Sequence, residues 1–235
     1  DPGRRRVANT RILGVHRSGK QVVFDLARGR RRTPEIFLAV HLRMTGRLIW
    51  IEHGGRSAGR ARAELVLDRG RIVFIDTRRF GTIRIHDDLA QLGPRGLEPL
   101  SDELTSRVLG ELIGRSSQPV KAWLLRQDRL VGIGNIYASE ILFSCRIDPR
   151  RAVGSLTRSE VSGLQRAVRS VLRRAIECCG TTFSDFQDAR GQTGGFARLL
   201  KVYGRQGEPC RRCRGEIARI VQQQRSTFFC SDCQR

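Results

Sequence analysis

The chain has 235 residues and a formal net charge of +21. A chain of this length can bury one large core or divide into two or three compact units. No apolar run approaches the roughly 20 residues that a membrane-spanning helix needs, and the basic start Asp1–Arg4 is no signal peptide. The basic residues are spread along the whole chain. This charge favours a polyanionic partner, with nucleic acid ahead of an anionic membrane surface, because neutralised phosphates release counterions.

Residues 11–86 are predicted to be β structure. Short apolar or alternating runs, separated by turns rich in glycine and arginine, are typical of an antiparallel sandwich or barrel. These runs are Gln21–Leu26, Glu35–Leu42, Glu64–Leu67, Arg71–Ile75 and Thr82–Ile85. The segment Arg56–Arg62 is interpreted as an exposed basic loop.

The Gly- and Pro-rich stretch Leu92–Pro99 predicts a linker, and helices are expected to follow it. Ser101 is predicted to cap a helix that runs to about Arg115. Thr157–Glu160 predicts a capping box, followed by an apolar helical stripe that ends before Gly180.

Two apolar helical segments, Val120–Leu130 and Ile136–Cys145, flank a turn that contains Gly132 and Gly134. Backbone amides in such a turn are expected to face outwards, and the start of the second helix adds the positive end of its dipole. Asn135 is expected to cap this helix and to contact a phosphate. Taken alone, a glycine turn is more often a plain connection between helices.

Two CxxC pairs near the C-terminus are separated by sixteen residues. This spacing predicts one tetrahedral zinc ion held by Cys210, Cys213, Cys230 and Cys233. A redox role is disfavoured, because one such pair would suffice for it. Strands at Glu216–Val221 and Ser226–Phe229 are expected between the pairs, and so small a unit needs its metal to fold. The hairpin is either a structural ribbon or a ribbon that lays its tip on DNA.

The other three cysteines lie in apolar or helical surroundings. They are Cys145, Cys178 and Cys179. We expect them to be reduced, buried thiols, which fits a cytoplasmic protein.

Four motifs stand in chain order at His41–Gly46, Asp76–Gly81, Gln127–Glu140 and Val202–Gln234. Together they resemble the bacterial formamidopyrimidine-DNA glycosylases, and the resemblance runs from about Ile12 to the C-terminus. It implies a base-excision repair enzyme that removes oxidised purines (8-oxoguanine and formamidopyrimidines) and cleaves the abasic strand by β,δ-elimination. The implied partner is duplex DNA with a flipped oxidised base or an abasic site.

The resemblance implies that Met44, Arg78 and Phe80 enter the DNA stack. Chemistry on a base requires taking it out of the duplex, which leaves a hole. Apolar side chains can fill such a hole, and an arginine can hydrogen-bond the orphaned partner base. Without the resemblance, Met44 and Phe80 would be interpreted as core residues of strands.

All but three of the 44 basic residues are arginine, so each lysine is a candidate for a position where arginine will not serve. Lys20, at a hairpin turn, matches the lysine that the family places beside the reaction centre. The resemblance also implies that Arg225 contacts phosphates near the lesion, and that Glu140 supports the active site or satisfies buried backbone. Gly191–Phe196 matches the loop over the extruded base. Further predicted DNA contacts are Arg60, Lys121, Gly134, Asn135 and Tyr203.

The start of the chain departs from the family pattern. Family members begin with a proline whose free secondary amine attacks the sugar, followed by a glutamate. Here Asp1 acylates the nitrogen of Pro2, and Gly3 follows, so Pro2 is not expected to be the nucleophile. The intact lesion-handling residues favour a fragment of a longer protein over a naturally shortened, inactive relative.

The expected fold is α+β and multi-domain. It comprises a truncated β-sandwich at 1–95, a helix-two-turn-helix domain at 96–200 and a zinc β-hairpin at 201–235. We expect a monomer in the bacterial cytoplasm, associated with the nucleoid. Three alternatives remain: a glycosylase for oxidised pyrimidines, a non-catalytic damaged-DNA binder, and a zinc-ribbon nucleic-acid module without lesion preference.

Overall fold

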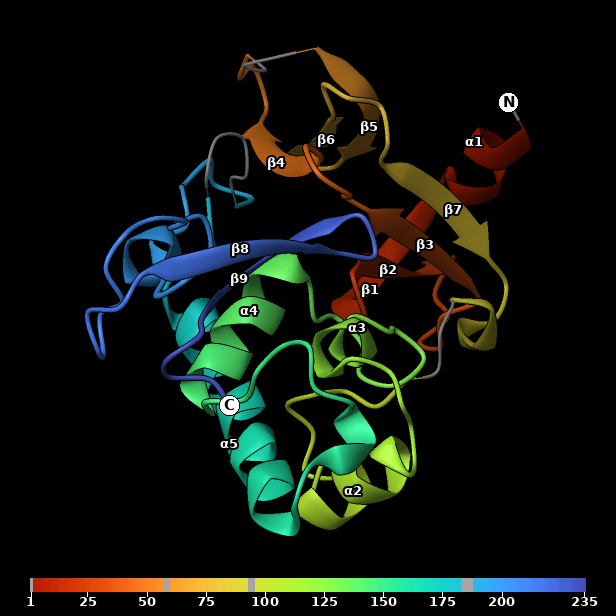
Figure 1. The fold of residues 1–235 in the computed structure, drawn as a ribbon. Coiled ribbons are helices and arrows are strands. Elements are labelled where there is room, and N and C mark those ends of the chain that lie inside the picture. The colour runs from red at the N-terminus through yellow and green to blue at the C-terminus, as the bar shows by residue number, and fades with distance from the viewer. Residues whose placement is uncertain (1, 57–59, 93–95, 183–187) are drawn as a thin grey trace. The chain divides into compact units, whose positions relative to one another are not determined.

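The computed structural model describes residues 2–56, 60–92, 96–182 and 188–235 (Figure 1). The chain forms two compact units, residues 1–93 with 182–194 and residues 94–181 with 195–235. The helices that follow residue 96 and the cysteine-bearing hairpin thus share one unit. The centre of the predicted linker, residues 93–95, and residues 57–59 of the predicted basic loop lie outside the described residues. The three domain boundaries remain predictions.

The first unit is an antiparallel β-sandwich preceded by helix α1 (Pro2–Val7). One sheet has the order β1-β2-β3-β7, formed by β1 (Thr10–Ser18), β2 (Gln21–Arg28), β3 (Ile36–His41) and β7 (Thr82–His86). The other has the order β4-β6-β5, formed by β4 (Arg47–Glu52), β5 (Ala61–Leu67) and β6 (Gly70–Ile75). The fold predicted for this part of the chain is confirmed.

The core of the sandwich follows from the alternation of side chains along β2 and β3. Phe24 and Leu38 point into one cluster, which also contains Phe74 of β6. Val23 and Phe37 point to the opposite face and pack with Leu92. These central strands are therefore buried on both faces. Strands β1 and β4 were not predicted from apolar runs. Both lie at sheet edges and expose much of their length.

The second unit contains helices α2 (Ser106–Ile113), α3 (Val120–Leu124), α4 (Asn135–Ser144) and α5 (Arg158–Glu177). Their apolar faces share one core, with fully buried Leu109, Trp123, Leu142 and Leu164. The predicted capping box of α5 is confirmed, since the Thr157 side chain and Glu160 satisfy each other's backbone amides. Short 3-10 helices lie at Leu89–Gln91, Val153–Ser155 and Phe196–Leu199.

Two predicted helix boundaries are wrong. Thr105, and not Ser101, caps α2, because its hydroxyl accepts the amide of Val108 at 3.2 Å. Ser101 instead donates its hydroxyl to the carbonyl of Glu98 in the preceding turn. The predicted helix 120–130 ends early, at Leu124. Leu130 forms an isolated β-bridge with Leu97, which takes this part of the chain out of helical conformation.

Strands β8 (Ile217–Gln222) and β9 (Arg225–Cys230) pair as the predicted hairpin. Gln223 and Gln224 form its two-residue turn with φ of 47° and 58°, the conformation that matches the twist of paired strands. The hairpin packs through Phe228 against Phe143 of α4.

The three cysteines outside the hairpin differ in their exposure. Cys145 and Cys178 are half-buried, where buried thiols were expected, and Cys179 is exposed. It lies beyond the last residue of α5 and has a φ of 57°, so the prediction of a buried thiol is wrong there.

Among the described residues, no helix has the length and apolar character needed to cross a bilayer.

Candidate nucleic-acid interface and zinc centre

Two loops of the first unit carry the predicted wedge residues. Met44 lies between β3 and β4 and is 71% exposed, and Phe80 lies between β6 and β7 and is 55% exposed. The guanidinium of Arg78 stacks over the Phe80 ring, 5.0 Å from its centroid. Large apolar side chains this exposed are not core residues. The structure therefore excludes a core role for Met44 and Phe80.

A buried carboxylate joins the two loops. Asp76 is 2% exposed; it accepts the hydroxyl of Thr45 and, at 2.7 Å, the amide of Gly81. Thr45 in turn accepts the amide of Arg78 at 3.2 Å. Burial raises the pKa of Asp76, but these hydrogen bonds, with those from the backbone of Arg78 and Arg79, outweigh it and lower the pKa below its usual value. The ionised carboxylate thus holds both loops.

The backbone of these loops is also constrained. Arg43 and Arg79, each beside a wedge residue, have φ of 56° and 60°. A Cβ on Gly81 would come within 2.5 Å of the Phe74 ring, so this position requires glycine. Thr45 and Asp76 lie inside the sequence motifs, but no role was predicted for them. A small polar residue beside Met44 and a carboxylate close to Phe80 could have indicated a hydrogen bond between the two loops.

Lys20 occupies the turn between β1 and β2 and is exposed. The next residue, Gln21, pairs with His41 across β2 and β3. Burial lowers the pKa of His41, and the charges of Arg43 and Lys20 lower it further. Lys20 therefore lies at the end of the sheet from which the Met44 loop leaves.

The glycine turn of the second unit is organised by one side chain. Gln127 accepts the amide of Gly132 at 2.9 Å and donates to the carbonyls of Leu125 and Ile133. The amide of Gly132 is thus not free to face outwards as expected. Gly134, in extended conformation, is the N-cap of α4, and no side chain caps the helix. The prediction that Asn135 caps α4 is wrong, because Asn135 is its first helical residue.

The side chain of Asn135 is instead directed to the hairpin. Its Nδ2 donates to the carbonyl of Ser226 at 2.9 Å, beside Arg225 at the tip. Lys121 of α3 donates to the same carbonyl at 2.9 Å and to the Thr227 hydroxyl at 2.7 Å. Two helices therefore hold one peptide group of the hairpin tip. We call this arrangement, Lys121, Asn135 and Ser226, the tip clamp.

The predicted direct DNA contact by Lys121 requires correction. The residue is 1% exposed, and its amine is already bound to the hairpin. Burial, with a smaller contribution from the nearby charge of Arg225, lowers its pKa to about 8. Lys121 therefore acts on the tip rather than on solvent. Arg225 itself is exposed.

Glu140 of α4 is 3% exposed and serves the backbone. Its two carboxylate oxygens accept the amides of Lys201, Val202 and Tyr203, each at 2.9 Å. Of the two predicted roles, this geometry fits the satisfaction of buried backbone, and the catalytic assignment is corrected to a positioning one. Tyr203 is half-buried, with its ring edge-on to Phe228 at 5.0 Å.

The loop predicted to cover an extruded base is partly described. Residues 183–187 lie outside the described part of the chain, and residues 188–194 belong to the first unit. The carbonyl of Ala189 accepts the amide of Trp50, on the edge strand β4, at 2.9 Å. Arg60, before β5, is exposed.

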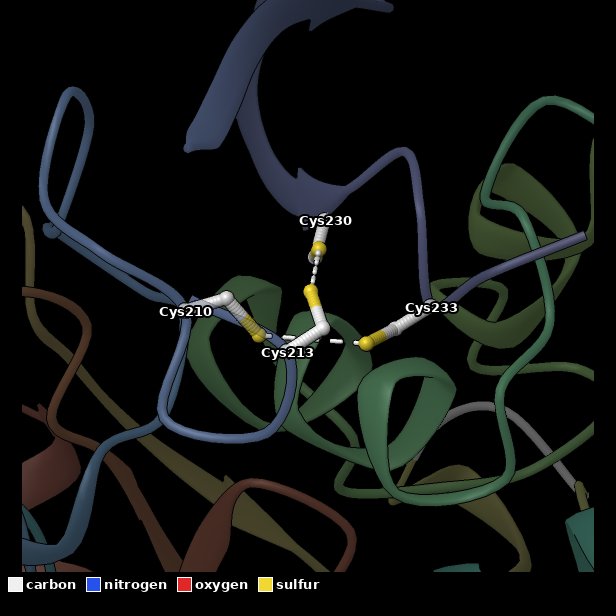
Figure 2. A group of neighbouring side chains, drawn as sticks. All are labelled: Cys210, Cys213, Cys230 and Cys233. Atoms are coloured by element: carbon white, nitrogen blue, oxygen red, sulfur yellow. Dashed lines mark hydrogen bonds between the residues drawn. The ribbon is translucent and has the colours of Figure 1, made fainter. Parts of the chain in front are cut away.

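The four predicted metal ligands converge at the base of the hairpin (Figure 2). Their sulfurs lie within 4.8 Å of one another, with 3.9 Å between Cys210 and Cys233 and 3.5 Å between Cys213 and Cys230. Tetrahedral zinc with bonds of about 2.3 Å sets its sulfurs about 3.8 Å apart. The cysteines therefore fit one structural zinc ion, and four thiolates leave no position for a substrate.

The fold and these sites define a class of protein. A β-sandwich with exposed wedge loops, a helical unit and a zinc hairpin with a basic tip are the parts of a DNA-repair glycosylase. The chain matches the models of the formamidopyrimidine-DNA glycosylase N-terminal domain over residues 2–83 and H2TH domain over 95–187. Residues 207–235 match the zinc finger found in FPG and IleRS. The chain belongs to the formamidopyrimidine-DNA glycosylase family.

Individual relatives agree with this assignment. The formamidopyrimidine-DNA glycosylase of Salmonella arizonae is 38% identical over 98% of this chain and 84% of its own length. The MutM (Fpg) protein of Thermus thermophilus superposes with a TM-score of 0.85 at 38% identity, over 96% of this chain and 83% of that one. A Lactococcus lactis FPG mutant, solved with Fapy-dG containing DNA, has a TM-score of 0.85 at 28% identity, with the same coverage.

Replacement of Asp76 tests the link between the wedge loops. Asp76→Asn should lower the free energy of unfolding by about 1–3 kcal/mol, because an amide cannot accept at both positions. The lowered pKa means that the wild-type contribution is complete above the unfolded pKa, near 4, and is lost as the pH falls through the folded value. Urea unfolding between pH 3 and 7 measures both effects. Asp68→Asn, at an exposed turn, is the control, and equal losses in the two variants would contradict the link.

Replacement of Lys121 tests the tip clamp. Lys121→Met keeps the buried stem but removes both donated hydrogen bonds, which is expected to cost about 1–3 kcal/mol of tip ordering. Affinity for an abasic-site duplex should fall by roughly tenfold while bound zinc is retained. Lys201→Met, at an exposed lysine, should bind as the wild type does. Unchanged affinity of Lys121→Met for the duplex would show that the tip clamp does not contribute to DNA binding.

Loss of a zinc ligand should unfold the finger. Cys213→Ser is expected to lose the metal and to weaken duplex binding sharply, because metal binding supplies the folding free energy of so small a unit. Zinc content and duplex affinity are measured on the same sample. The matched control is Cys179→Ser at an exposed cysteine outside the cluster. Zinc loss with unchanged duplex binding would show that the finger is not a DNA contact.

Proposed function

We propose that this chain acts in base-excision repair as a glycosylase for oxidised purines, with 8-oxoguanine and formamidopyrimidines as substrates. We further propose that the protein cleaves the resulting abasic strand by β,δ-elimination and works as a monomer in the bacterial cytoplasm. The observation that carries the proposal is the pair of exposed loops with Met44 on one and the Arg78–Phe80 stack on the other.

The loops suit the insertion of side chains into DNA. Extruding a base costs a few kcal/mol of stacking and pairing, and a rigid wedge offsets part of this cost. Asp76 orders both loops before any DNA arrives, so little conformational entropy is lost on insertion. Arg78 combines a planar face, stacked on Phe80, with donors for the unpaired base opposite the lesion. This combination favours a glycosylase for oxidised purines over one for oxidised pyrimidines.

Backbone contacts would hold the duplex in register. In the second unit, the first amides of α4 lack intrahelical acceptors, and Arg225 stands beside the clamped Ser226. Such a helix start with an adjacent arginine suits one phosphate group. In the first unit, exposed Lys20 and Arg60 would add phosphate contacts. Two further residues complete the proposed DNA-binding set. Gly134 is the N-cap of α4, and Tyr203 packs against Phe228 of the hairpin.

The proposed chemistry follows the family resemblance. A secondary amine attacks the anomeric carbon of the sugar, the bond to the oxidised base breaks, and the base leaves with a proton. The bond between the anomeric carbon and the ring oxygen then opens, with a proton going to that oxygen, and the resulting iminium promotes elimination of the strand. Lys20, a compact amine, would contact phosphate and exchange protons in the elimination. Asp1 acylates the nitrogen of Pro2, so in the chain as printed Pro2 is no amine.

Borohydride trapping tests the proposal. The substrate is a duplex with 8-oxoguanine opposite cytosine, and the chain as printed is compared with one extended by the family's Pro-Glu start. Covalent trapping and strand cleavage by the extended chain are expected. In that chain, Met44→Ala should slow single-turnover excision at least about tenfold, since the wedge offsets unstacking. Val66→Ala, at an exposed apolar side chain of β5, is the control.

The other outcomes discriminate between the alternatives. Absence of trapping by either chain, with tight binding to an abasic duplex, would identify a non-catalytic damaged-DNA binder. Faster excision from an oxidised-pyrimidine duplex would identify the sister activity. Trapping by the chain as printed would point to another amine, and Lys20→Arg would then test the first candidate. Equal affinity for abasic and intact duplexes would favour a zinc-ribbon module without lesion preference.

A further inference from the structure

The outer face of α5 carries a shallow and open depression, lined by residues of α5, that the repair site does not use. We call it the basic groove. The groove has a volume of about 510 Å³. Its lining includes four arginines and two neutral hydrogen-bonding side chains: Arg166, Arg169, Arg173, Arg174, Gln165 and Ser170. Glu177 stands at its C-terminal end as the single carboxylate of the lining.

The helical repeat explains why these arginines gather on one face. Positions 166, 169 and 173 are spaced by three and four residues, which places them on one side of a helix. The buried residues Val161, Leu164 and Val168 lie on the opposite side and pack into the helical core. Arg166 and Arg173 rise about 10 Å apart along the axis, at 1.5 Å per residue.

Two of the four arginines keep a positive charge that no carboxylate of the described residues neutralises. Among the described residues, neither Arg166 nor Arg173 forms a salt bridge; Arg166 donates only to the hydroxyl of Ser162, at 2.7 Å. Arg174 pairs with Glu177 at 3.0 Å. The unpaired charges of Arg166 and Arg173 lie on one side of the helix, about two turns apart, so an anion in the groove would be attracted to both.

Arg169 adds a built-in element to the groove. Its side chain is 21% exposed, and its guanidinium reaches the carbonyl of Ser101 and lies 3.5 Å from Asp102. Its Nε is buried and donates to no atom in the described part of the chain. The contacts to Ser101 and Asp102 therefore fix the position of this arginine among the lining residues of the groove.

The chemistry of the lining selects phosphates over an acidic protein segment. Protein interfaces bury an apolar or aromatic centre, whereas no apolar residue lines this groove. Contacts to nucleic-acid backbones come from arginine together with serine and glutamine side chains, and the groove offers these residue types. The spacing of Arg166, Arg169 and Arg173 along about 10 Å of helix suits two or three successive phosphates.

The groove is separate from the proposed repair interface within the second unit. Helix α4 packs against β9 and also against α5, whereas, among the described residues, α5 makes no comparable contact with β8 or β9. The residues of α5 that face α4 are those of its apolar stripe, and the arginines face away from them. A duplex held at the tip clamp therefore leaves the α5 groove open.

We propose that the basic groove of α5 binds the phosphate backbone of a second DNA duplex while the first occupies the repair interface. The contact is expected to be independent of sequence and of damage, since arginine, serine and glutamine side chains commonly contact the nucleic-acid backbone. A chain that holds two duplexes can pass from one DNA segment to another without release into solution. The proposal rests on the proposed function only in naming the first duplex.

The experiment counts duplexes per chain. The chain is first saturated with an abasic-site duplex carrying one fluorophore, and an undamaged duplex with a second fluorophore is then added at low salt. Coincidence of the two fluorophores on one chain is the expected result. Binding of the second duplex should weaken with salt at a logarithmic slope of about −0.9 for each phosphate contacted.

The test variant is Arg166→Gln with Arg173→Gln, which spares Arg169 and its contacts to the loop at Ser101. It should reduce binding of the second duplex at least about tenfold and lower its salt slope by about two, since two phosphate contacts are lost. Affinity for the abasic duplex should not change. The charge-matched control is Arg30→Gln with Arg32→Gln, two exposed residues between β2 and β3. They lie at the opposite end of the sheet from Lys20 and the Met44 loop.

Three outcomes would overturn the proposal. The first is a ratio of one duplex per chain at every salt concentration. The second is equal loss of the second duplex in both double variants, which would mark a general effect of charge. The third is loss of abasic-duplex affinity in Arg166→Gln with Arg173→Gln, which would place the groove within the first interface. Failure of the repair function alone would leave the count of duplexes unaffected, so the two failures are distinguishable.

Discussion

The convergence of four thiolates is the interaction on which the second unit depends. The hairpin of β8 and β9 has few apolar residues of its own, and zinc supplies the folding free energy that such a core cannot. Once the hairpin is formed, Phe228 packs on Phe143, and the carbonyl of Ser226 comes within reach of Lys121 and Asn135. The position of Arg225 therefore follows from a metal cluster at the other end of two short strands.

Two buried carboxylates organise backbone elsewhere in the chain. Asp76 orders the wedge loops of the first unit, and Glu140 binds three successive amides of the segment that leads into the zinc finger. An ionised carboxylate accepts several hydrogen bonds at once, so a single residue can replace the regular secondary structure that a loop lacks. Both residues shape the proposed site without any need to touch DNA.

Several features could be predicted from the sequence because their cause is local. The spacing of the cysteine pairs, the capping box at Thr157 and the apolar stripe of α5 each depend on residues a few positions apart. The predictions for Asn135 and Lys121 failed because distant residues compete for the same group. Asn135 was expected to cap its own helix, but its amide is used by Ser226, 91 positions away. Lys121 was expected to contact DNA, but its amine donates hydrogen bonds to Ser226 and Thr227.

The sequence by itself determined the partner class, the metal site and the family, because charge, ligand spacing and ordered motifs do not depend on how the chain folds. Only the tertiary structure decided whether Met44 and Phe80 are core or surface, since a period-two pattern assigns faces but cannot show that a residue lies in a loop. The structure also decided that Glu140 and Lys121 are buried and position other groups. Burial depends on every segment that packs around a side chain, and such contacts join residues far apart in the sequence.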